Sequence, residues 1–439
     1  MPSAEHGATA PGLIRAIGPW ALAAFAINGT IGAGIFGLPA KIQAVVGNYS
    51  IVMMVLCGAL IAIVALCFAE VASRFDRTGG PQVYAAATFG PVAGFGVGWM
   101  LWVSRLASCS AIVNLLIDYG NLLWAPLREP LVRALAITAV VVAYTWLNVR
   151  GIRQATAIST TFTIAKLVPL IGFVAVGAFF VEPAAIDLPA LPTAADFSTA
   201  ILLATFAFFG FDATTVVAGE VREPRRSIPF AIFVAIGSVV VLYAAIQLVC
   251  VATVPELATS ERPLAEAATA MVGSWGGIAM SLGAVVSCLG VFGAVMTPGT
   301  RQMYALAESQ QLPTVLARLH ARYRTPHWSI LVTGLAILLL ALSGSFIYLA
   351  KISLITRITV FAITCATLPL MRRRADLPEA TFKLPAGSVF GFAGAALYVV
   401  FLATSSMREL VDVAIAVMVG FALFGLCRYV RRDAPLGNV

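Results

Sequence analysis

The sequence predicts an all-α protein that crosses a membrane about twelve times, because three features agree. Of the 439 residues, 60% are hydrophobic and only 11% are charged, whereas soluble domains contain about 25% charged residues. Apolar stretches of roughly 20 residues recur along the chain, and each is long enough to cross about 30 Å of hydrocarbon. Arginine-rich connections between these stretches alternate with acidic or nearly neutral ones. Polytopic membrane proteins have these properties.

The predicted spans leave no sizeable soluble domain between them. They cover residues 15–44, 50–74, 92–124, 131–149, 154–181, 197–220, 228–254, 275–304, 327–343, 346–370, 387–404 and 409–430. The polar stretch Met1–Pro11 lacks the basic start and apolar core of a signal peptide. We therefore expect the first span to remain in the mature protein.

Positive charge at the span ends predicts the orientation. The basic residues of every second connection are Arg74 and Arg77; Arg150 and Arg153; Arg222, Arg225 and Arg226; Arg318, Arg322 and Arg324; and Arg372, Arg373, Arg374 and Lys383. The positive-inside rule places these connections, with tails 1–14 and 431–439, on the cytoplasmic side of a cell (inner) membrane. Topology also accounts for the net charge of +8, so we expect the lipid bilayer and no nucleic acid as a partner.

The remaining polar features are sparse. Two short amphipathic segments, Gln82–Phe89 and Leu264–Met271, are interpreted as interfacial helices. The seven cysteines fall within apolar runs without paired spacing, so we expect reduced packing residues rather than disulfides or metal ligands. No catalytic constellation, metal cluster or phosphate loop is apparent. The sequence therefore argues against an enzyme and against a bound cofactor, and leaves a proton as the candidate coupling ion.

The first span contains a dense interruption. Four glycines and a proline occur between Gly29 and Pro39. Each interior glycine costs about 1 kcal/mol relative to alanine, and proline removes a hydrogen-bond donor. Close helix packing through small residues would need only two glycines. Non-helical backbone at this depth is tolerated where it is buried in protein or lines a cavity, so the density of glycines favours a broken helix.

The sixth span carries a weaker interruption, at Gly210-Phe211-Asp212. Spans one and six are five apart, so they can be equivalent elements of two five-span repeats. An odd number of spans inverts one repeat relative to the other, and paired broken spans indicate the solute site of a transporter. The helix amino ends at such a site suit a carboxylate, and the unwound carbonyls suit an ammonium group.

Several segments then resemble the amino acid–polyamine–organocation (APC) superfamily. The similar segments are Ile31-Gly-Ala-Gly-Ile-Phe, Phe68-Ala-Glu-Val-Ala, Thr78-Gly-Gly-Pro-Gln-Val-Tyr84, Phe89-Gly-Pro91, Gly210-Phe-Asp-Ala, Gly219-Glu-Val-Arg-Glu-Pro-Arg-Arg-Ser-Ile-Pro229, Arg301-Gln-Met-Tyr-Ala-Leu-Ala and Leu312-Pro313. They cover nearly the whole chain, in the order of the family. The resemblance is to the bacterial amino acid permease and antiporter type.

This resemblance implies the LeuT-like fold. A ten-helix core would cover residues 15–370, with inverted repeats at 15–181 and 197–370, unwound helices 1 and 6, and two peripheral helices within 387–430. It also implies transport of amino acids or related amines by alternating access.

The resemblance also carries site residues onto this sequence by position. The backbone of the first break would hold the substrate carboxylate and part of its ammonium group, through Ile31, Gly32, Ala33 and Gly34. Carbonyls of the sixth span would complete the ammonium site, near Phe206, Ala207 and Phe209, with the Phe206 ring as a gate. The side-chain pocket would be lined by Ser104, Arg105, Cys109, Val295, Ser353 and Arg357.

Two positions depart from the pattern. Some relatives have a hydroxyl residue at the position of Ala33, so recognition here depends mainly on the main chain. Some arginine/agmatine exchangers carry a tryptophan at the position of Val295, which argues against that activity.

Four charged residues fall near the middle of spans: Arg105, Lys166, Asp212 and Arg357. A charge at the bilayer centre costs at least about 2.5–3.5 kcal/mol on insertion scales, so each is a candidate functional residue. Lys166 resembles a fifth-span lysine that replaces the ion of sodium-coupled relatives, and we expect its ammonium to reach the unwound backbone at Gly29. Its alternative role is a structural amine that caps carbonyls.

Each of the other charged residues in the spans has two possible roles. Asp212 either caps the inner half-helix or senses protons. Arg105 and Arg357 either pair with Asp118, Asp212 or Glu70, or contact an acidic substrate side chain. Glu70 and Glu220 lie near the cytoplasmic ends of spans two and six, and we expect them to form an intracellular gate with Arg74, Arg222 or Arg226.

The favoured function is a sodium-independent secondary transporter of amino acids, working by exchange or proton symport. A polyamine or amine transporter of the same fold, an amino-acid sensor that does not transport, and a channel are the weaker alternatives. Monomer and homodimer are both compatible with the sequence.

Overall fold

The computed structural model describes residues 17–75, 80–151, 166–181, 191–216, 221–374, 376–403 and 406–432. This part of the chain is mainly helical, and its β structure is limited to one isolated bridge between Ile17 and Val221. The α-helices are α1 (Pro19–Thr30), α2 (Gly34–Val46), α3 (Ser50–Ala72), α4 (Pro81–Phe89), α5 (Pro91–Leu123), α6 (Pro130–Arg150), α8 (Ala194–Ala207), α9 (Ala213–Val216), α10 (Pro224–Thr253), α11 (Pro263–Val272), α12 (Ser274–Glu308), α13 (His327–Ser343), α14 (Phe346–Met371), α15 (Gly387–Ala403) and α16 (Met407–Arg432). A further apolar helix covers Lys166–Gly177.

The prediction of an all-α polytopic membrane protein is confirmed. Seven helical stretches of the described chain are long and apolar enough to cross a membrane. Shorter apolar helices, including Lys166–Gly177, α8 and α13, lie between them in the chain. Each of the twelve predicted spans contains at least one described helix. The limits of the two repeats and of the tails remain predictions.

Both predicted interruptions are present. The first span is split between α1, which ends at Thr30, and α2, which begins at Gly34. The sixth span is split between α8, which ends at Ala207, and the short α9, which begins at Ala213.

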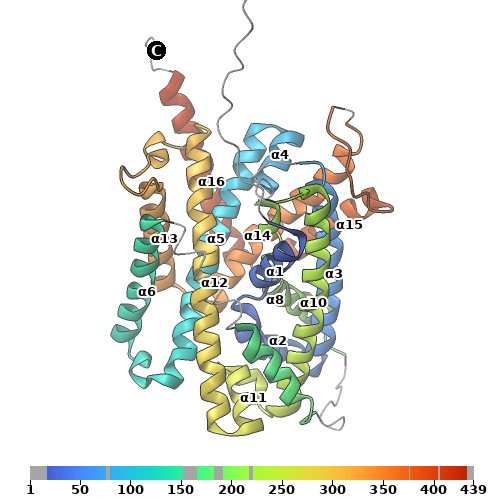
Figure 1. Ribbon diagram of the computed structural model, residues 1–439, viewed down its shortest axis with the longest axis vertical. Helices are drawn as coiled ribbons and strands as arrows, with labels where there is room; N and C mark the ends of the chain where they lie inside the picture. Colours follow the sequence, from blue (N-terminus) through green and yellow to red (C-terminus); the bar gives the residue numbers. More distant parts are fainter. Residues whose placement is uncertain are drawn as a thin grey trace, which may run out of the picture.

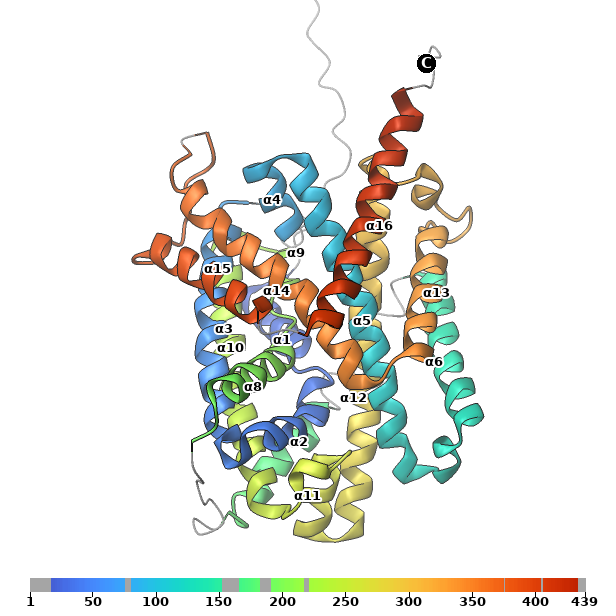
Figure 2. The same ribbon diagram turned by 180° about the vertical axis from the view of Figure 1, so that it is seen from behind.

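The long helices pack around α5, whose most apolar stretch is entirely buried. Helix α5 contacts α12 and α14 most extensively, while α6 and α13 lie side by side at one edge (Figures 1 and 2). Only 11% of the corresponding stretches of α6 and α16 is buried, as expected for helices that face lipid. The core therefore encloses the middle of α5 and the two broken spans.

The arginine-bearing connections gather at one end of the bundle. Figure 1 shows α4 at this end and α11 at the opposite end. Arg374 donates to the carbonyl of Ala87 at 2.8 Å, and the Thr381 hydroxyl donates to the carbonyl of Arg225 at 2.9 Å. The connection after α12 joins the same end, because the Gln311 amide donates to the carbonyl of Pro91 at 3.4 Å. These contacts place the connections before α4, before α10, after α12 and after α14 at one end of the bundle, and the cytoplasmic location of that end stays a prediction.

The two segments predicted as interfacial helices are helical, as α4 and α11. Each packs against the bundle: α4 against α5 and α14, and α11 against α12 and α2. Six of the seven cysteines are buried, and Cys427 is partly buried.

Candidate functional site

The two helix breaks meet backbone to backbone at the centre of the bundle. A Cβ atom placed on Gly34 would lie 2.7 Å from the Cα of Ala207. A Cβ atom on Gly210 would lie 2.0 Å from the carbonyl oxygen of Gly29, and Gly210 has a φ of +127°. Glycine is needed at Gly210 for both reasons, since other residues rarely adopt this φ.

Tyr243 of α10 ties the two breaks together. Its hydroxyl lies 3.1 Å from the carbonyl oxygen of Thr30 and 3.1 Å from that of Ala207, the last residues of α1 and α8. The side chain is fully buried. We did not predict this residue, because a single tyrosine in an apolar span carries no pattern that distinguishes it from a packing residue.

Lys166 reaches the first break from the helix Lys166–Gly177. Its Nζ lies 2.5 Å from the carbonyl oxygen of Asn28 and 2.6 Å from that of Ile31, and the residue is 1% exposed. The expected region of contact is therefore correct, but the partner is not Gly29. The end of a helix leaves its last carbonyls without intrahelical donors, and the ammonium group bonds to those of Asn28 in the last turn of α1 and of Ile31 just after it.

The predicted carboxylate site is the start of α2. Ile31 and Ala33 are buried in the break, and Gly34 is the first residue of α2. The first amides of a helix have no intrahelical acceptor and lie at the positive end of the dipole. On the α12 side, Val291 is the neighbour of Gly32, since it lies 3.8 Å from a Cβ placed there. Val295, which the resemblance predicts to line the side-chain pocket, lies one turn further along α12.

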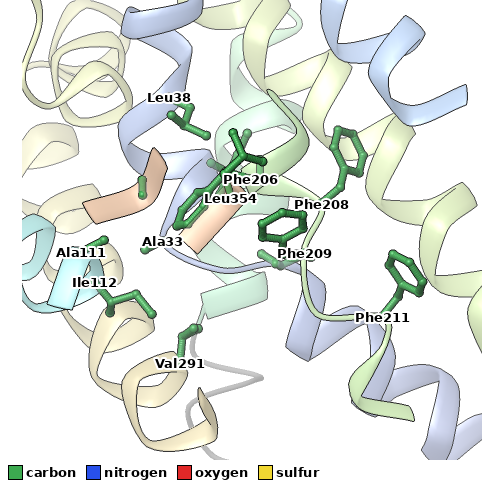
Figure 3. Packing of buried hydrophobic residues seen from close by; sticks show 14 of the residues in the cluster. Ala33, Leu38, Ala111, Ile112, Phe206, Phe208, Phe209, Phe211, Val291 and Leu354 are labelled. Carbon is green, nitrogen blue, oxygen red and sulfur yellow. The ribbon is translucent and has the colours of Figure 1, made fainter. Parts of the chain in front are cut away.

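Aromatic rings close the sixth-span side of the site. Figure 3 shows Phe206 in the last turn of α8 and Phe208, Phe209 and Phe211 along the segment that follows, with Ala33 nearby. The ring of Phe206 lies 5.9 Å from that of Phe209 and 6.2 Å from that of Phe346. Phe206 is 8% exposed, so its ring is buried between the sixth span and α14 in this conformation.

A cluster of serines joins α5 to α14. The Ser104 hydroxyl lies 3.0 Å from the Ser353 carbonyl, and the hydroxyls of Ser108 and Ser353 are 2.6 Å apart. The Nε of Arg357 donates to the Ser104 hydroxyl at 3.2 Å. The structure thus brings together three predicted site residues and adds Ser108. Its spacing of four residues from Ser104 would have revealed it, because residues i and i+4 share one face of a helix.

Arg357 and Asp212 form a buried ion pair, with Nη1 and Oδ1 separated by 3.5 Å. Arg357 also lies over the Phe209 ring, 4.9 Å from its centroid. Oδ1 of Asp212 accepts no hydrogen bond from the described residues, so this oxygen does not cap α9. Of the predicted alternatives for Arg357, the pairing with Asp212 is confirmed.

Arg105 has a different environment. Its Nη1 donates to the side-chain oxygen of Gln302 at 3.3 Å, and Gln302 in turn donates to Gln82 of α4. The ion-pair partner of Asp118 is Arg133, at 2.7 Å, and not Arg105.

Cys109 lies one turn further along α5. Its Sγ is 3.8 Å from the carbonyl oxygen of Phe292 on α12. The thiol therefore packs at the contact between α5 and α12.

Glu70 is the centre of a cluster of ion pairs and hydrogen bonds at the arginine-rich end of the bundle. Its carboxylate accepts two hydrogen bonds from Arg372, at 2.7 and 2.6 Å, and one from the amide of Leu384 at 2.8 Å. Arg74 is 3.9 Å away. Among the expected partners of Glu70, Arg74 is confirmed as a weak one, whereas Arg226 pairs with Glu223. We had not predicted Arg372, which comes from the connection between α14 and α15.

The predicted gate residue Glu220 lies outside the described residues.

Two crossed broken helices, a buried lysine at the break and a buried charge pair describe a membrane transporter with a site between its helix halves. The family model for amino acid permeases matches residues 17–424. The chain therefore belongs to the amino acid permease family, within the APC superfamily.

Relatives of this chain are also transporters. Transporters of uncharacterized function from Mycobacterium bovis and Mycobacterium tuberculosis are 28% identical over 412 residues, which cover 93% of this chain and 90% of the relative. The methylthioribose transporter of Bacillus subtilis is 26% identical over 396 residues, covering 85% of this chain and 84% of the relative.

Proposed function

We propose that this transporter carries amino acids across the inner membrane by alternating access, without sodium, as an exchanger or a proton symporter. In this proposal both termini lie in the cytoplasm, on the side of the arginine-rich connections. A sensor that binds without transporting is the weaker alternative.

The observation that carries the proposal is the position of the Lys166 ammonium group. It lies between the carbonyl oxygens of Asn28 and Ile31, at 2.5 and 2.6 Å. Unwound carbonyls of this kind coordinate the coupling ion in sodium-driven transporters of broken-helix folds. A protein cation already bonded to them removes both the space and the electrostatic need for a metal cation.

The same geometry supports a zwitterionic substrate. The amides at the start of α2 face a position where the helix dipole favours a carboxylate. The carbonyls of Phe206 and Ala207 lie at the end of α8, where a positive group is favoured. A carbonyl oxygen has two lone pairs, so Ala207 can accept from a substrate ammonium group as well as from Tyr243.

The test is counterflow in proteoliposomes that contain the purified protein. Labelled amino acids should accumulate against an internal unlabelled pool in choline buffer as fast as in sodium buffer. An imposed proton gradient then separates the two coupling modes, because only a symporter accumulates substrate without an internal pool. Strict dependence on sodium would contradict the proposal, and saturable binding without counterflow would favour a sensor.

The Bacillus subtilis relative supports a second candidate, a neutral thiosugar. The same liposomes should be loaded with methylthioribose. Competition by methylthioribose, without competition by any amino acid, would favour this candidate.

A further inference from the structure

Two guanidinium groups and one carboxylate share the buried centre of the bundle. Arg105, Arg357 and Asp212 are 4%, 6% and 2% exposed. Asp212 pairs with Arg357 at 3.5 Å, and the charges of both act on Arg105. The three groups together carry one excess positive charge.

No described carboxylate pairs with Arg105. Along the same helix, Asp118 is bonded to Arg133 at 2.7 Å. Towards the arginine-rich end, Glu70 is bonded to Arg372 at 2.6 Å. Among the described residues, Arg105 instead donates to the neutral side-chain amide of Gln302, at 3.3 Å. A buried cation without a counter-ion is costly, so a bound anion at this position would stabilise it.

The guanidinium of Arg105 is also held in a fixed orientation, which suits the binding of a carboxylate. It donates to Gln302 of α12, which in turn donates to Gln82 of α4. These two side chains therefore orient the guanidinium. The neighbouring Ser104 bonds to Arg357 and Ser353, which lie on α14. A guanidinium presents two parallel N–H donors. It therefore matches the two oxygens of a carboxylate better than the ammonium group of a lysine would.

We propose that Arg105 binds the side-chain carboxylate of the substrate, and that the site therefore takes amino acids with an anionic side chain. Asp212 neutralises Arg357, and the substrate supplies the counter-ion of Arg105. Gln302 is a positioning residue that orients the Arg105 guanidinium. The inference rests on the proposed function, because it needs the substrate backbone to lie between the helix breaks.

The experiment compares two pairs of nearly isosteric amino acids, aspartate with asparagine and glutamate with glutamine, in counterflow by the full-length protein. The native protein should prefer the acids by tenfold or more. Arg105→Gln should lower the apparent affinity for the acids by tenfold or more and leave that for the amides unchanged. Arg105→Lys keeps the positive charge but loses the paired donors of the guanidinium. Its preference for the acids should therefore fall between those of the native protein and Arg105→Gln.

Gln302→Leu tests the positioning role. It should raise KM for the acids severalfold with little change in maximal rate, while the amides are unaffected. Arg301→Gln is the matched control, because Arg301 is the adjacent residue of α12 and donates to the carbonyl of Thr297 instead. It should leave the preference for acids as it is in the native protein.

Three results would overturn the inference. Equal transport of acids and amides by the native protein would leave amino acid transport intact and remove the acidic selectivity. Equal losses for both classes in Arg105→Gln and Arg105→Lys would make Arg105 a structural cation. Exchange of other amino acids without exchange of these four would overturn the inference alone, whereas failure of every amino acid to exchange would overturn the proposed function itself.

Discussion

The backbones of Gly29 and Gly210 touch where the two broken spans cross. A Cβ atom on Gly210 would lie 2.0 Å from the Gly29 oxygen and 2.4 Å from its carbonyl carbon. The contact is main chain against main chain, so no change of side-chain rotamer can relieve it. The position of one broken span is thereby fixed against the other at the level of the backbone.

Gly210→Ala should therefore destabilise the protein by roughly 2–6 kcal/mol, from backbone strain and from overpacking. The melting temperature in detergent and the rate of counterflow report the effect. Gly237→Ala on α10 is the control, because a Cβ atom there meets nothing within 4 Å. A Gly210→Ala protein that melts and transports like the native one would contradict the close crossing of the two breaks.

Tyr243→Phe should loosen the connection between the breaks without changing the shape of the core. The variant leaves the carbonyls of Thr30 and Ala207 without the hydroxyl that lies 3.1 Å from each. Loss of a buried partner costs about 1–3 kcal/mol. Thermal unfolding should show this decrease, while Tyr429→Phe, at a tyrosine that is 67% exposed, should show none. Equal stability of the two variants would argue against a bridging role for Tyr243.

The sequence predicted the positions of the breaks and the buried charges because both depend on local composition. Glycine density indicated the gap between Thr30 and Gly34, and a lone lysine in an apolar span indicated Lys166 as a functional residue. The choice of partner depends on the tertiary fold. Lys166 bonds to the carbonyls of Asn28 and Ile31 rather than that of Gly29, because those two oxygens lie within its reach.

Partners that are distant in sequence were the main omissions. Glu70 and Arg372 are 302 residues apart, and no periodicity in a single chain links them. The contact between Val291 of α12 and Gly32 also depends on the register of α12 against the first break, which local composition does not determine. Ser108 and Gln302, in contrast, were within reach of the sequence. Ser108 lies four residues after the predicted Ser104 on the same helix, and Gln302 belongs to the segment Arg301–Ala307 that carries the family resemblance.

The Glu70–Arg372 pair should contribute coupling energy that a surface pair does not. Hydrogen bonds to a charged group contribute about 1.5–3 kcal/mol, and the carboxylate of Glu70 is fully buried. A double-mutant cycle with Glu70→Gln and Arg372→Gln in thermal unfolding measures the coupling. The control cycle uses Lys383 and Glu379, an exposed pair at 3.0 Å, which should couple by less than about 1 kcal/mol. Similar coupling energies in the two cycles would mean that the Glu70–Arg372 pair stabilises the protein no more than an exposed pair does.

The same pair predicts how this coupling responds to pH. The hydrogen bonds that Arg372 donates to the Glu70 carboxylate raise the pKa of its guanidinium above the usual value. A cation with a raised pKa contributes stability that is fully present below its unfolded pKa and is lost only as the pH rises through its folded pKa. Both values lie far above neutrality, so titration of Arg372 should not alter the coupling energy near neutral pH. A decrease of this coupling between neutral and mildly alkaline pH would contradict the assignment.

Lys166→Met should affect both stability and transport. The side chain keeps a similar length but leaves the carbonyls of Asn28 and Ile31 without their donor, and each loss costs about 1–3 kcal/mol. The break should then become less ordered, and sodium-independent counterflow should fall by tenfold or more. Thermal unfolding with and without sodium tests whether the vacated carbonyls accept a metal cation, which would raise the melting temperature of the variant only. Lys383→Met is the matched control, since Lys383 is exposed and pairs with Glu379. Full counterflow in Lys166→Met would mean that the ammonium group merely fills space, and the argument for sodium independence would fail with it.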